Sequence, residues 1–409
     1  MYDIIIIGGG ISGFYTAFRI LKEKPDCKIL LLEKNDYFGG RIFTASHNGF
    51  KLEAGAGRFN QEHKLFIELL HELNLSKYQV EIDGEIEFIP STKYDSKYLK
   101  VNPFDIMTVV LNRAKRTSRK ELQKYAFIDY ASTILHEDDI KFLKDSLGYY
   151  QQLMEMNAYD AFVLFEYGMH SKNTFFTLKN GISQVITGLH NKIKHKCVCK
   201  KNMNVTNISY ENDKFKISVD SVKNPYESKL CVAAIPVPHL MKIPYFCFLK
   251  EDLKSIKTKE LCRIYSQFKK EDIWFKDINK TTTNNNSRYI IPINREKGWI
   301  MISYTDSIFA KYWKKMSHSD IIEKTTKNIE KTFKISIKKP EFTKVCYWDI
   351  GTSFWIPNVD SKKISKRIYN PKENRMLYIC GESVSLRQGW MEGALESGER
   401  VVNDLIKNL

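Results

Sequence analysis

Three glycines and one acid near the start of the chain have the spacing of a turn that binds a pyrophosphate. Gly8, Gly10 and Gly13 follow one apolar run, and Glu33 ends the next. In such a turn the first glycine permits a tight bend, the second lets the backbone approach phosphate, and the third lets helix and strand pack closely. An acid placed like Glu33 accepts hydrogen bonds from ribose hydroxyls. This pattern predicts a bound dinucleotide, but the glycines alone leave NAD and FAD undecided.

The turn must be positioned by a strand before it and a helix after it. Residues 2–7 are almost continuously apolar, as in a strand buried on both faces of a parallel sheet. Apolar residues then recur at helical spacing from Phe14 to Leu21, and residues 28–32 form a second apolar run. Together these elements predict a βαβ unit with an N-terminal helix end that attracts phosphate. The residues predicted to line this part of the site are Gly8, Gly10, Ile11, Ser12, Gly13, Glu33 and Lys34.

The length and charge of the chain limit its fold class, its number of domains and its possible partners. The chain has 409 residues with a globular composition, which excludes a disordered or collagen-like chain. Because a single core rarely grows beyond roughly 250–300 residues, we expect two domains. The net charge of +16 attracts polyanions non-specifically. The basic clusters at 113–120, 192–201 and 362–367 come without a nucleic-acid motif, so we expect solvated faces and no specific nucleic-acid partner.

The chain carries no sequence signal for export, membrane insertion or metal binding. No apolar run approaches the ~18 residues that a membrane helix needs, and Asp3 stands where a signal peptide would be basic. Cys197 and Cys199 lack the second ligand pair of a zinc site. We therefore expect reduced thiols, no metal, no membrane partner and a cytoplasmic protein, whose oligomeric state stays open.

Element types change along the chain. Residues 60–180 are predicted to be mostly helical, residues 181–240 return to short strands, and residues 245–375 combine strands with helix. A last strand is expected at 376–380, followed by a helix through Ile406. The Thr- and Asn-rich tract 281–287 is predicted to be a solvated loop.

A second glycine-rich loop resembles the flavin-containing amine oxidase family. Residues 39–41 read Gly-Gly-Arg, and residues 52–58 read Leu-Glu-Ala-Gly-Ala-Gly-Arg. In that family the loop lies along the pyrophosphate and the flavin ring, so the resemblance implies FAD. Arg41 would neutralise phosphate, since its guanidinium can bind two oxygens at once. The resemblance assigns cofactor contacts here to Gly39, Gly40, Arg41, Gly55, Ala56, Gly57 and Arg58.

The end of the chain is similar to the closing FAD motif of the same family. Residues 378–382 read Tyr-Ile-Cys-Gly-Glu, and residues 389–394 read Gly-Trp-Met-Glu-Gly-Ala. Residues 179–184 resemble a further turn of the family, and residues 204–208 resemble the strand that meets the adenine. By this resemblance Glu382 holds ribityl or nearby hydroxyls, and the helix from Met391 directs its N-terminus at the flavin N1–C2=O edge. The implied contacts are Val205, Gly381, Glu382, Trp390, Met391 and Ala394.

The resemblance implies an α/β fold with two domains. One is a Rossmann-like FAD-binding domain built from discontinuous segments, and the other is an α+β substrate domain with a mixed sheet and helices. On this chain the FAD-binding domain is expected to comprise residues 1–78, 181–240 and 376–409. Residues 79–180 and 241–375 are expected to form the substrate-binding domain.

The resemblance also implies a reaction. The family oxidises a C–N bond: a hydride passes from the carbon beside an uncharged amine to flavin N5, the imine hydrolyses, and O2 reoxidises the flavin to give peroxide. The expected partners are thus a small-molecule amine and O2, and no essential protein base is needed. The long-range charge of +16 disfavours polyamines. Two alternatives stay open, namely a desaturase-like or protoporphyrinogen oxidase-like enzyme and a flavin-binding protein without turnover.

Aromatic walls flank the substrate amine in that family. Trp390 stands where one wall is expected, and the segment 348–355 resembles the opposing loop, so Phe354 or Trp355 is the candidate for the other. Some relatives tether flavin through a cysteine in this loop. Thr352 and Ser353 occupy that place here, and Cys346 is too far upstream, which predicts non-covalent FAD.

Arg263 departs from the family pattern. It falls where the family often has a lysine that a water links to flavin N5, in a strand that precedes Trp274. Arginine is a fixed cation and cannot relay a proton. Arg263 could pair with a substrate carboxylate, steady the reduced flavin, or form a salt bridge at the domain junction. The substitution disfavours fast oxidase turnover.

Overall fold

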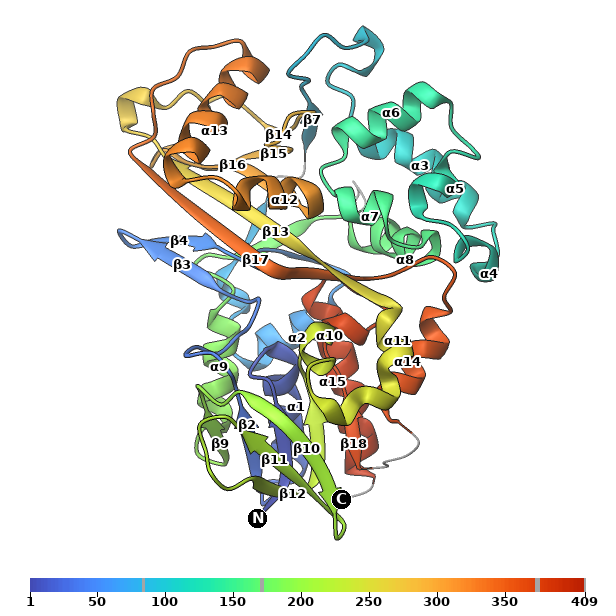
Figure 1. The fold of residues 1–409 in the computed structure, drawn as a ribbon. Coiled ribbons are helices and arrows are strands. Elements are labelled where there is room, and N and C mark those ends of the chain that lie inside the picture. The colour runs from blue at the N-terminus through green and yellow to red at the C-terminus, as the bar shows by residue number, and fades with distance from the viewer. Residues whose placement is uncertain (83–84, 170–172, 372–375, 408–409) are drawn as a thin grey trace.

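The molecule is built around two large sheets at opposite ends of an elongated shape (Figure 1). The computed structural model describes residues 1–82, 85–169, 173–371 and 376–407. The lower sheet has both termini near its outer end, and the upper sheet lies among the helices at the far end (Figure 1). Long strands of the upper sheet reach down to the lower half, so segments from both halves meet at the middle.

The lower sheet contains the predicted parallel strands. Its order is β10-β11-β12-β1-β2-β9, with β18 also pairing β12. β1 pairs in parallel with both β12 and β2, and Ile4 to Ile6 are fully buried. Burial on both faces explains the continuous apolar runs of these strands. The strands are β1 (Tyr2–Ile7), β2 (Ile29–Leu32), β9 (Cys197–Lys200), β10 (Val205–Glu211), β11 (Lys214–Val219), β12 (Tyr226–Ala233) and β18 (Leu377–Ile379).

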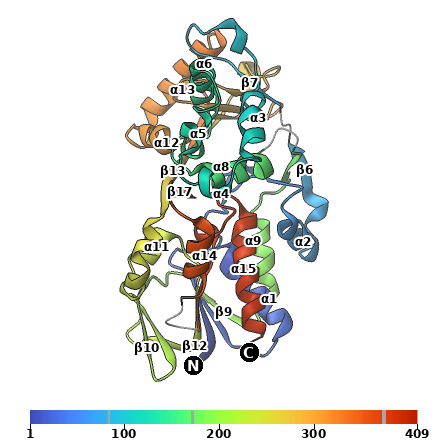
Figure 2. The same ribbon diagram turned by 90° about the vertical axis from the view of Figure 1, so that its right-hand side faces the viewer.

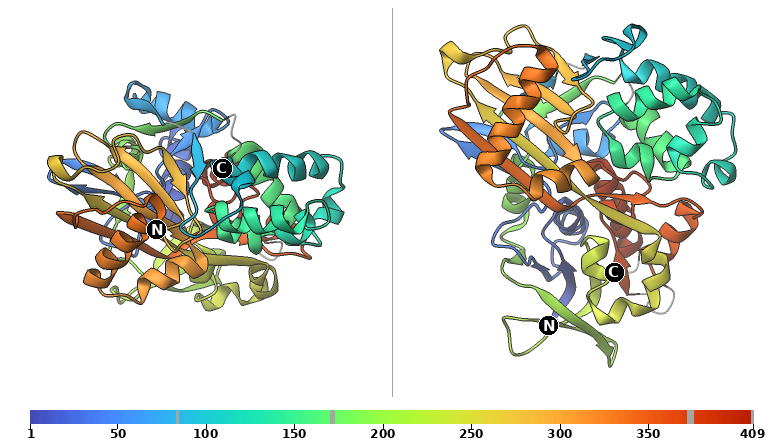
Figure 3. Two further views of the ribbon diagram at one scale, coloured as in Figure 1. Left: turned by 90° about the horizontal axis from the view of Figure 1, so that it is seen from above. Right: turned by 45° about the horizontal axis from the view of Figure 1, so that its top comes forward.

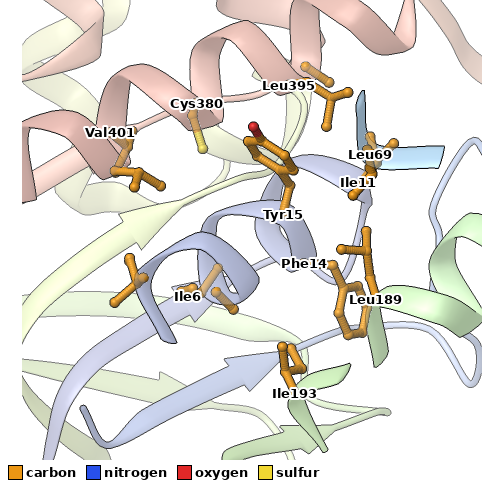
Figure 4. Close-up of a cluster of buried hydrophobic side chains, with 14 of the residues drawn as sticks. Ile6, Ile11, Phe14, Tyr15, Leu69, Leu189, Ile193, Cys380, Leu395 and Val401 are labelled. Atoms are coloured by element: carbon orange, nitrogen blue, oxygen red, sulfur yellow. The ribbon is translucent and has the colours of Figure 1, made fainter. Parts of the chain in front are cut away.

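Three helices cover one face of this sheet. α1 (Ile11–Glu23), α9 (Gln184–Ile193) and α15 (Met391–Ile406) lie side by side (Figure 2). Their apolar sides meet in one core, to which Phe14, Leu189 and Leu395 contribute (Figure 4). The sheet and its helices therefore join the start, middle and end of the chain. α2 (Lys64–Glu72) packs against α15 and lies within the range 60–180 that was predicted to be mostly helical.

The upper sheet is mixed. Its order is β17-β13-β16-β15-β14-β7, and its pairs are antiparallel except for the parallel pair β14–β7. α12 (Ser307–Lys314) and α13 (His318–Phe333) pack on one face through Trp313 and Ile329. The strands are β7 (Ile86–Phe88), β13 (Ile256–Gln267), β14 (Lys280–Thr282), β15 (Tyr289–Asn294), β16 (Trp299–Asp306) and β17 (Phe342–Trp355).

A cluster of helices stands beside the upper sheet (Figure 3). Its buried side chains form a core of their own, to which Phe354 and Trp390 also belong. The helices are α3 (Pro103–Ala114), α4 (Arg119–Leu122), α5 (Phe127–Ala131), α6 (Glu137–Ser146), α7 (Tyr150–Met154) and α8 (Ala158–Val163). The prediction that residues 60–180 are mostly helical thus holds for the centre of that range. At its ends the chain instead forms β6 (Gln79–Ile82) and β8 (Phe175–Leu178), which pair with each other and join β5 (Phe59–Asn60).

The prediction of a solvated loop at 281–287 is wrong. Thr281, Thr282, Thr283 and Ser287 are almost completely buried. The first two lie in β14, and Asn285 donates through Nδ2 to Thr332 Oγ1 of α13 at 2.9 Å. The polar side chains find internal partners, so the tract can be buried despite its hydrophilic composition.

The predicted division into domains remains a proposal. The strands of the lower sheet come from the segments assigned to the FAD-binding domain, and those of the upper sheet come from the segments assigned to the substrate-binding domain. A third sheet is mixed, because β5 of the first of these domains joins β6 and β8 of the second. We therefore propose that this three-stranded sheet is a junction rather than part of either domain. Residues 83–84, 170–172, 372–375 and 408–409 of the proposed ranges lie outside the described residues.

Asp306, at the end of β16, is expected to make the stability of the protein fall as the pH rises from about 4 to about 7. Burial raises the pKa of Asp306 to about 7, and the charge of Glu155 adds to the rise. The Gln151 N–H and the charge of Arg288 act in the opposite direction and lower this pKa. Because the folded pKa lies above the unfolded one, the native state holds the extra proton between about pH 4 and pH 7, and stability is lost as pH rises through that window.

Replacing Asp306 by Asn removes this titration. Urea unfolding at pH 5 and pH 8 should show that the free energy of unfolding of the parent falls by about 2 kcal/mol more than that of Asp306→Asn. Other titrating groups are common to both proteins and cancel in the difference. Parallel pH profiles for the two proteins would contradict the prediction.

Candidate functional site

A cavity of about 800 Å³ lies between the two sheets. It is lined at one end by the turn after β1 and at the other by β13, β16 and β17. The structure brings nearly all predicted cofactor residues to this one cavity, from four separate stretches of chain. Those lining it are Gly8, Gly10, Ile11, Ser12, Glu33, Lys34, Gly39, Gly40, Arg41, Gly55, Ala56, Gly57, Arg58, Val205, Gly381, Glu382, Trp390, Met391 and Ala394.

The glycine turn fits a pyrophosphate. A Cβ on Gly10 would meet nothing within 4 Å, because this backbone faces the cavity. Gly13 stands outside the lining, and a Cβ there would come within 2.1 Å of the Gly8 carbonyl oxygen. Helix α1 begins beside Gly10 with no side-chain cap, which leaves first-turn N–H groups for an anion. The turn therefore offers both the open space and the donors that phosphate needs.

The acid at the end of the second strand is held in place by backbone donors. Glu33 is 6% exposed, and its carboxylate accepts the N–H groups of Gly9 and Asn35, each at 2.8 Å. Its carboxylate is thereby fixed between the glycine turn and the cavity, with lone pairs left for hydroxyl donors. Lys34 lies next to it, with Nζ 3.0 Å from His239 Nε2.

Arg41 and Glu382, which the sequence assigned to separate parts of the cofactor, bind each other. Arg41 Nη1 lies 2.7 Å from Glu382 Oε2 and also donates to the Gly351 carbonyl at 3.2 Å. Glu382 further accepts the Gly389 N–H at 2.7 Å and the Ser353 hydroxyl at 3.1 Å. The contacts of Arg41 with Glu382 and Gly351 link three segments that are far apart in the sequence. No local sequence motif indicates this link.

The far end of the cavity is aromatic. Trp390 is 7% exposed, lines the cavity, and has an indole N–H without a hydrogen-bond partner among the described residues. The guanidinium of Arg58 stacks over Phe175 at 4.3 Å and faces Trp390 at 5.7 Å. It also donates to the Tyr149 hydroxyl at 2.6 Å. Arg58 thus belongs to this aromatic end.

The predicted second wall is wrong. Trp355 is fully buried in the core of the lower half and donates its indole N–H to the Ser385 carbonyl at 3.0 Å. Phe354 packs in the helical cluster, and neither residue lines the cavity. β17 leaves the cavity after Thr352, and its last residues pair with the start of β13.

Trp348, Tyr149 and Tyr304 line the cavity instead. The Trp348 indole donates to the Ala54 carbonyl at 2.7 Å, which ties β17 to the second glycine loop. Trp348 was within the segment singled out by resemblance, whereas the two tyrosines carry no sequence signal. They were missed because they come from separate elements that meet only in the folded chain.

Arg263 lines the cavity from β13, as the family alignment predicts for its position. It is 9% exposed, donates through Nη1 to the Glu53 carbonyl at 2.8 Å, and stands 4.8 Å from the ring centre of Tyr304. Its Nε has no partner, and no described carboxylate lies within 4.0 Å of its nitrogens. The interpretation of Arg263 as a junction salt bridge is therefore wrong for the part of the chain that the structure describes.

The lining has no thiol that could tether a cofactor. Thr352 lines the cavity and donates to Gln151 Oε1 at 2.5 Å, while Ser353 is bound to Glu382. Cys346 is buried in a separate cluster with Leu52 and Tyr265. The described lining therefore fits a dinucleotide held without a covalent bond.

Two further properties concern the whole of the described chain. Within residues 1–82, 85–169, 173–371 and 376–407, no three His, Cys, Asp or Glu side chains gather to hold a metal ion. Cys197 and Cys199 lie on β9 with their sulfurs 3.7 Å apart. No helix in these ranges has both the length and the hydropathy to cross a membrane.

Comparisons with known proteins place these observations in a family. A family model described as flavin containing amine oxidoreductase matches residues 11–406. A relative from Dictyostelium discoideum, named probable flavin-containing monoamine oxidase A, is 23% identical over 99% of this chain and 97% of its own length. The flavin-containing amine oxidase A of Equus caballus is 29% identical, over 23% of this chain and 18% of its own length.

Solved structures show the same fold. A redesigned putrescine oxidase superposes with a TM-score of 0.80 at 15% identity, covering 99% of each chain. A putative protoporphyrinogen oxidase from Exiguobacterium sp. 255-15 has a TM-score of 0.70 at 13% identity, covering 100% of this chain and 99% of its own.

Proposed function

Because the chain belongs to the flavin-containing amine oxidoreductase family, we propose that this FAD-dependent oxidoreductase oxidises the C–N bond of a small-molecule amine. The net reaction consumes the amine, O2 and water, and it gives a carbonyl compound, the released amine or ammonia, and H2O2. Bound FAD would supply the hydride acceptor, its N5 atom, and the later reduction of O2. The remaining work, which is binding, orientation and exclusion of water, falls to side chains of this chain.

The observation that carries the proposal is the continuity of one cavity from a phosphate-binding turn to an aromatic pocket. Gly10 and the N-terminus of α1 would hold the pyrophosphate, and Glu33 the adenosine ribose. Met391 lines the cavity at the first turn of α15, whose N-cap makes no side-chain hydrogen bond. The open N–H groups of that turn favour negative charge on the cofactor's carbonyl edge.

The aromatic end supports substrate binding without a protein base. Trp390, Tyr149 and Tyr304 give it apolar surface that excludes water. The cationic side chains there are Arg58 and Arg263, neither of which can accept a proton at neutral pH. We therefore propose that the amine loses its proton before or during binding, and that orientation against the aromatic faces prepares the C–H bond for transfer.

Anaerobic mixing with a panel of amines tests this function. The purified holoprotein should lose its oxidised-flavin absorbance with at least one amine, and admission of air should restore the band with release of H2O2. Bleaching by a porphyrinogen or a polyene and by no amine would replace the proposal with the porphyrinogen oxidase or desaturase alternative. A coproporphyrinogen III oxidase and a carotenoid desaturase each match this chain over 18% of its length. For this reason a porphyrinogen and a polyene belong in the panel. A flavin that no substrate bleaches would indicate a binding protein without turnover.

A further inference from the structure

The aromatic end of the cavity contains two arginines without a carboxylate partner. Arg58 and Arg263 both line it, and neither forms an ion pair within 4.0 Å among the described residues. Glu382, which also lines the cavity, is bound to Arg41, and Asp349 is paired with Lys314. Among the described residues, the two positive charges at this end therefore have no carboxylate in contact, and Arg263 is attracted only from farther away by Glu53.

The carboxylate of Glu53 does not compensate Arg263 directly. Its oxygens accept the Ile182 N–H at 2.7 Å and the Thr44 hydroxyl at 2.9 Å, while Arg263 binds its backbone carbonyl. Arg263 Nε is buried and finds no hydrogen-bond partner in the part of the chain that the structure describes. A buried guanidinium with an unused donor is costly unless an anion binds it.

The two arginines stand at either side of a tyrosine pair. Arg58 donates to the Tyr149 hydroxyl, and Arg263 lies over the ring of Tyr304. The two tyrosine rings are 6.3 Å apart between centroids. A ligand that reaches this end of the cavity thus comes between two fixed cations and aromatic surface.

A simple alkylamine fits this environment poorly. It is an ammonium ion at neutral pH, and two nearby cations in a buried space repel it. An amine that carries its own carboxylate is neutral overall, and the carboxylate can accept paired N–H bonds from a guanidinium. The same cations then lower the pKa of the neighbouring ammonium, which favours the uncharged amine that hydride loss requires.

We propose that the substrate is an amino acid or N-substituted amino acid, and that Arg263 binds its carboxylate while Arg58 supplies a second positive charge. The proposal rests on the amine-oxidising function proposed above and names its substrate class. Of the two anions suggested for Arg263, the substrate carboxylate and the reduced flavin, the proposal favours the substrate carboxylate.

A binding measurement tests the proposal without turnover. Benzoate and the neutral benzamide are titrated into the oxidised holoprotein, and affinity is followed by calorimetry and by the change in flavin absorbance. Benzoate should bind at least about 30-fold more tightly than benzamide, because only the carboxylate of benzoate can form a charge-assisted hydrogen bond with the guanidinium. Arg263→Met should reduce this preference to the smaller part that the charge of Arg58 supports, whereas Arg263→Lys, which keeps the charge but not the fork, should retain more of it.

The matched control is Lys257→Met, which removes the same charge from an exposed position of the same strand, outside the cavity lining. It should leave the preference for benzoate unchanged. Equal affinities of benzoate and benzamide in the parent protein would overturn the proposal, even if Arg263→Met failed to fold. An unchanged benzoate preference in a folded Arg263→Met holoprotein would overturn it as well.

Turnover separates this proposal from the function on which it rests. Phenylalanine and 2-phenylethylamine differ by one carboxylate, so the parent should use one enantiomer of phenylalanine with a kcat/KM at least about 100-fold higher. Flavin bleaching by 2-phenylethylamine alone would overturn the substrate class and leave amine oxidation standing. Bleaching by neither compound nor by any other amine would refute the proposed function, while the benzoate comparison would still decide what Arg263 binds.

Discussion

Gly10→Asp is expected to abolish FAD binding while the apoprotein stays folded. The backbone of Gly10 adopts a φ of −80°, which any residue can take, and a Cβ would project into the cavity without a contact. An aspartate there would add a negative charge where the pyrophosphate is expected. At about 4 Å and an intermediate dielectric this repulsion is worth about 4 kcal/mol, or about 1000-fold in affinity.

Flavin fluorescence titration of the apoprotein measures this loss, and thermal unfolding of the apoprotein checks the fold. Ser46→Asp is the control for the added charge, because Ser46 is exposed on β3 (Thr44–His47) and lies outside the cavity lining. It should bind FAD like the parent. A yellow Gly10→Asp protein with parental affinity would place the phosphates elsewhere.

Glu382→Leu is expected to destabilise the apoprotein by about 3–5 kcal/mol, the usual cost of removing one member of a buried ion pair. The carboxylate is buried and serves Arg41, Gly389 and Ser353 at once. Leucine would leave the guanidinium and a backbone N–H without their acceptor. Because the Arg41 side chain is 26% exposed, water recovers part of the loss, and the lower end of the range is expected.

Urea unfolding of the apoprotein provides the measurement. Glu382→Gln keeps the size and an acceptor oxygen but loses the charge, so it should lose about half as much stability as the leucine variant. Ser46→Leu, on an exposed position of β3, is the matched control for an added apolar side chain and should change stability by less than about 0.5 kcal/mol. A Glu382→Leu protein as stable as that control would show that the cross-link contributes nothing.

The sequence predicted those parts of the molecule whose signals are local. The βαβ unit around Gly8 to Gly13 is confirmed, because glycine spacing and apolar runs on both sides encode it within a short stretch. The family, the α/β fold and the FAD cofactor are likewise confirmed, since they depended on motifs in separate segments. Nearly all residues that these motifs named line the cavity, but many other lining residues, among them Tyr37, Met203 and His239, carry no motif signal.

The errors arose where structure depends on distant partners. The tract 281–287 is hydrophilic, yet α13 supplies acceptors that allow its burial, and nothing within the tract reveals this. Phe354 and Trp355 were placed by alignment at the cavity, but they lie at the end of β17 and pack into two separate cores. The ion pair of Arg41 with Glu382 was missed because each residue had already been given a separate role.

The order of segments in the lower sheet has a consequence for synthesis on the ribosome. β1 carries the first glycine turn, but its neighbour β12 is flanked by β18, and α1 is covered by α15, from the end of the chain. At a synthesis rate of roughly 5–20 residues per second, α15 is completed on the order of 20–80 s after α1, and the apolar side of α1 stays uncovered until then. During this interval the nascent chain exposes an apolar surface, so binding by a chaperone is an expected stage of its synthesis.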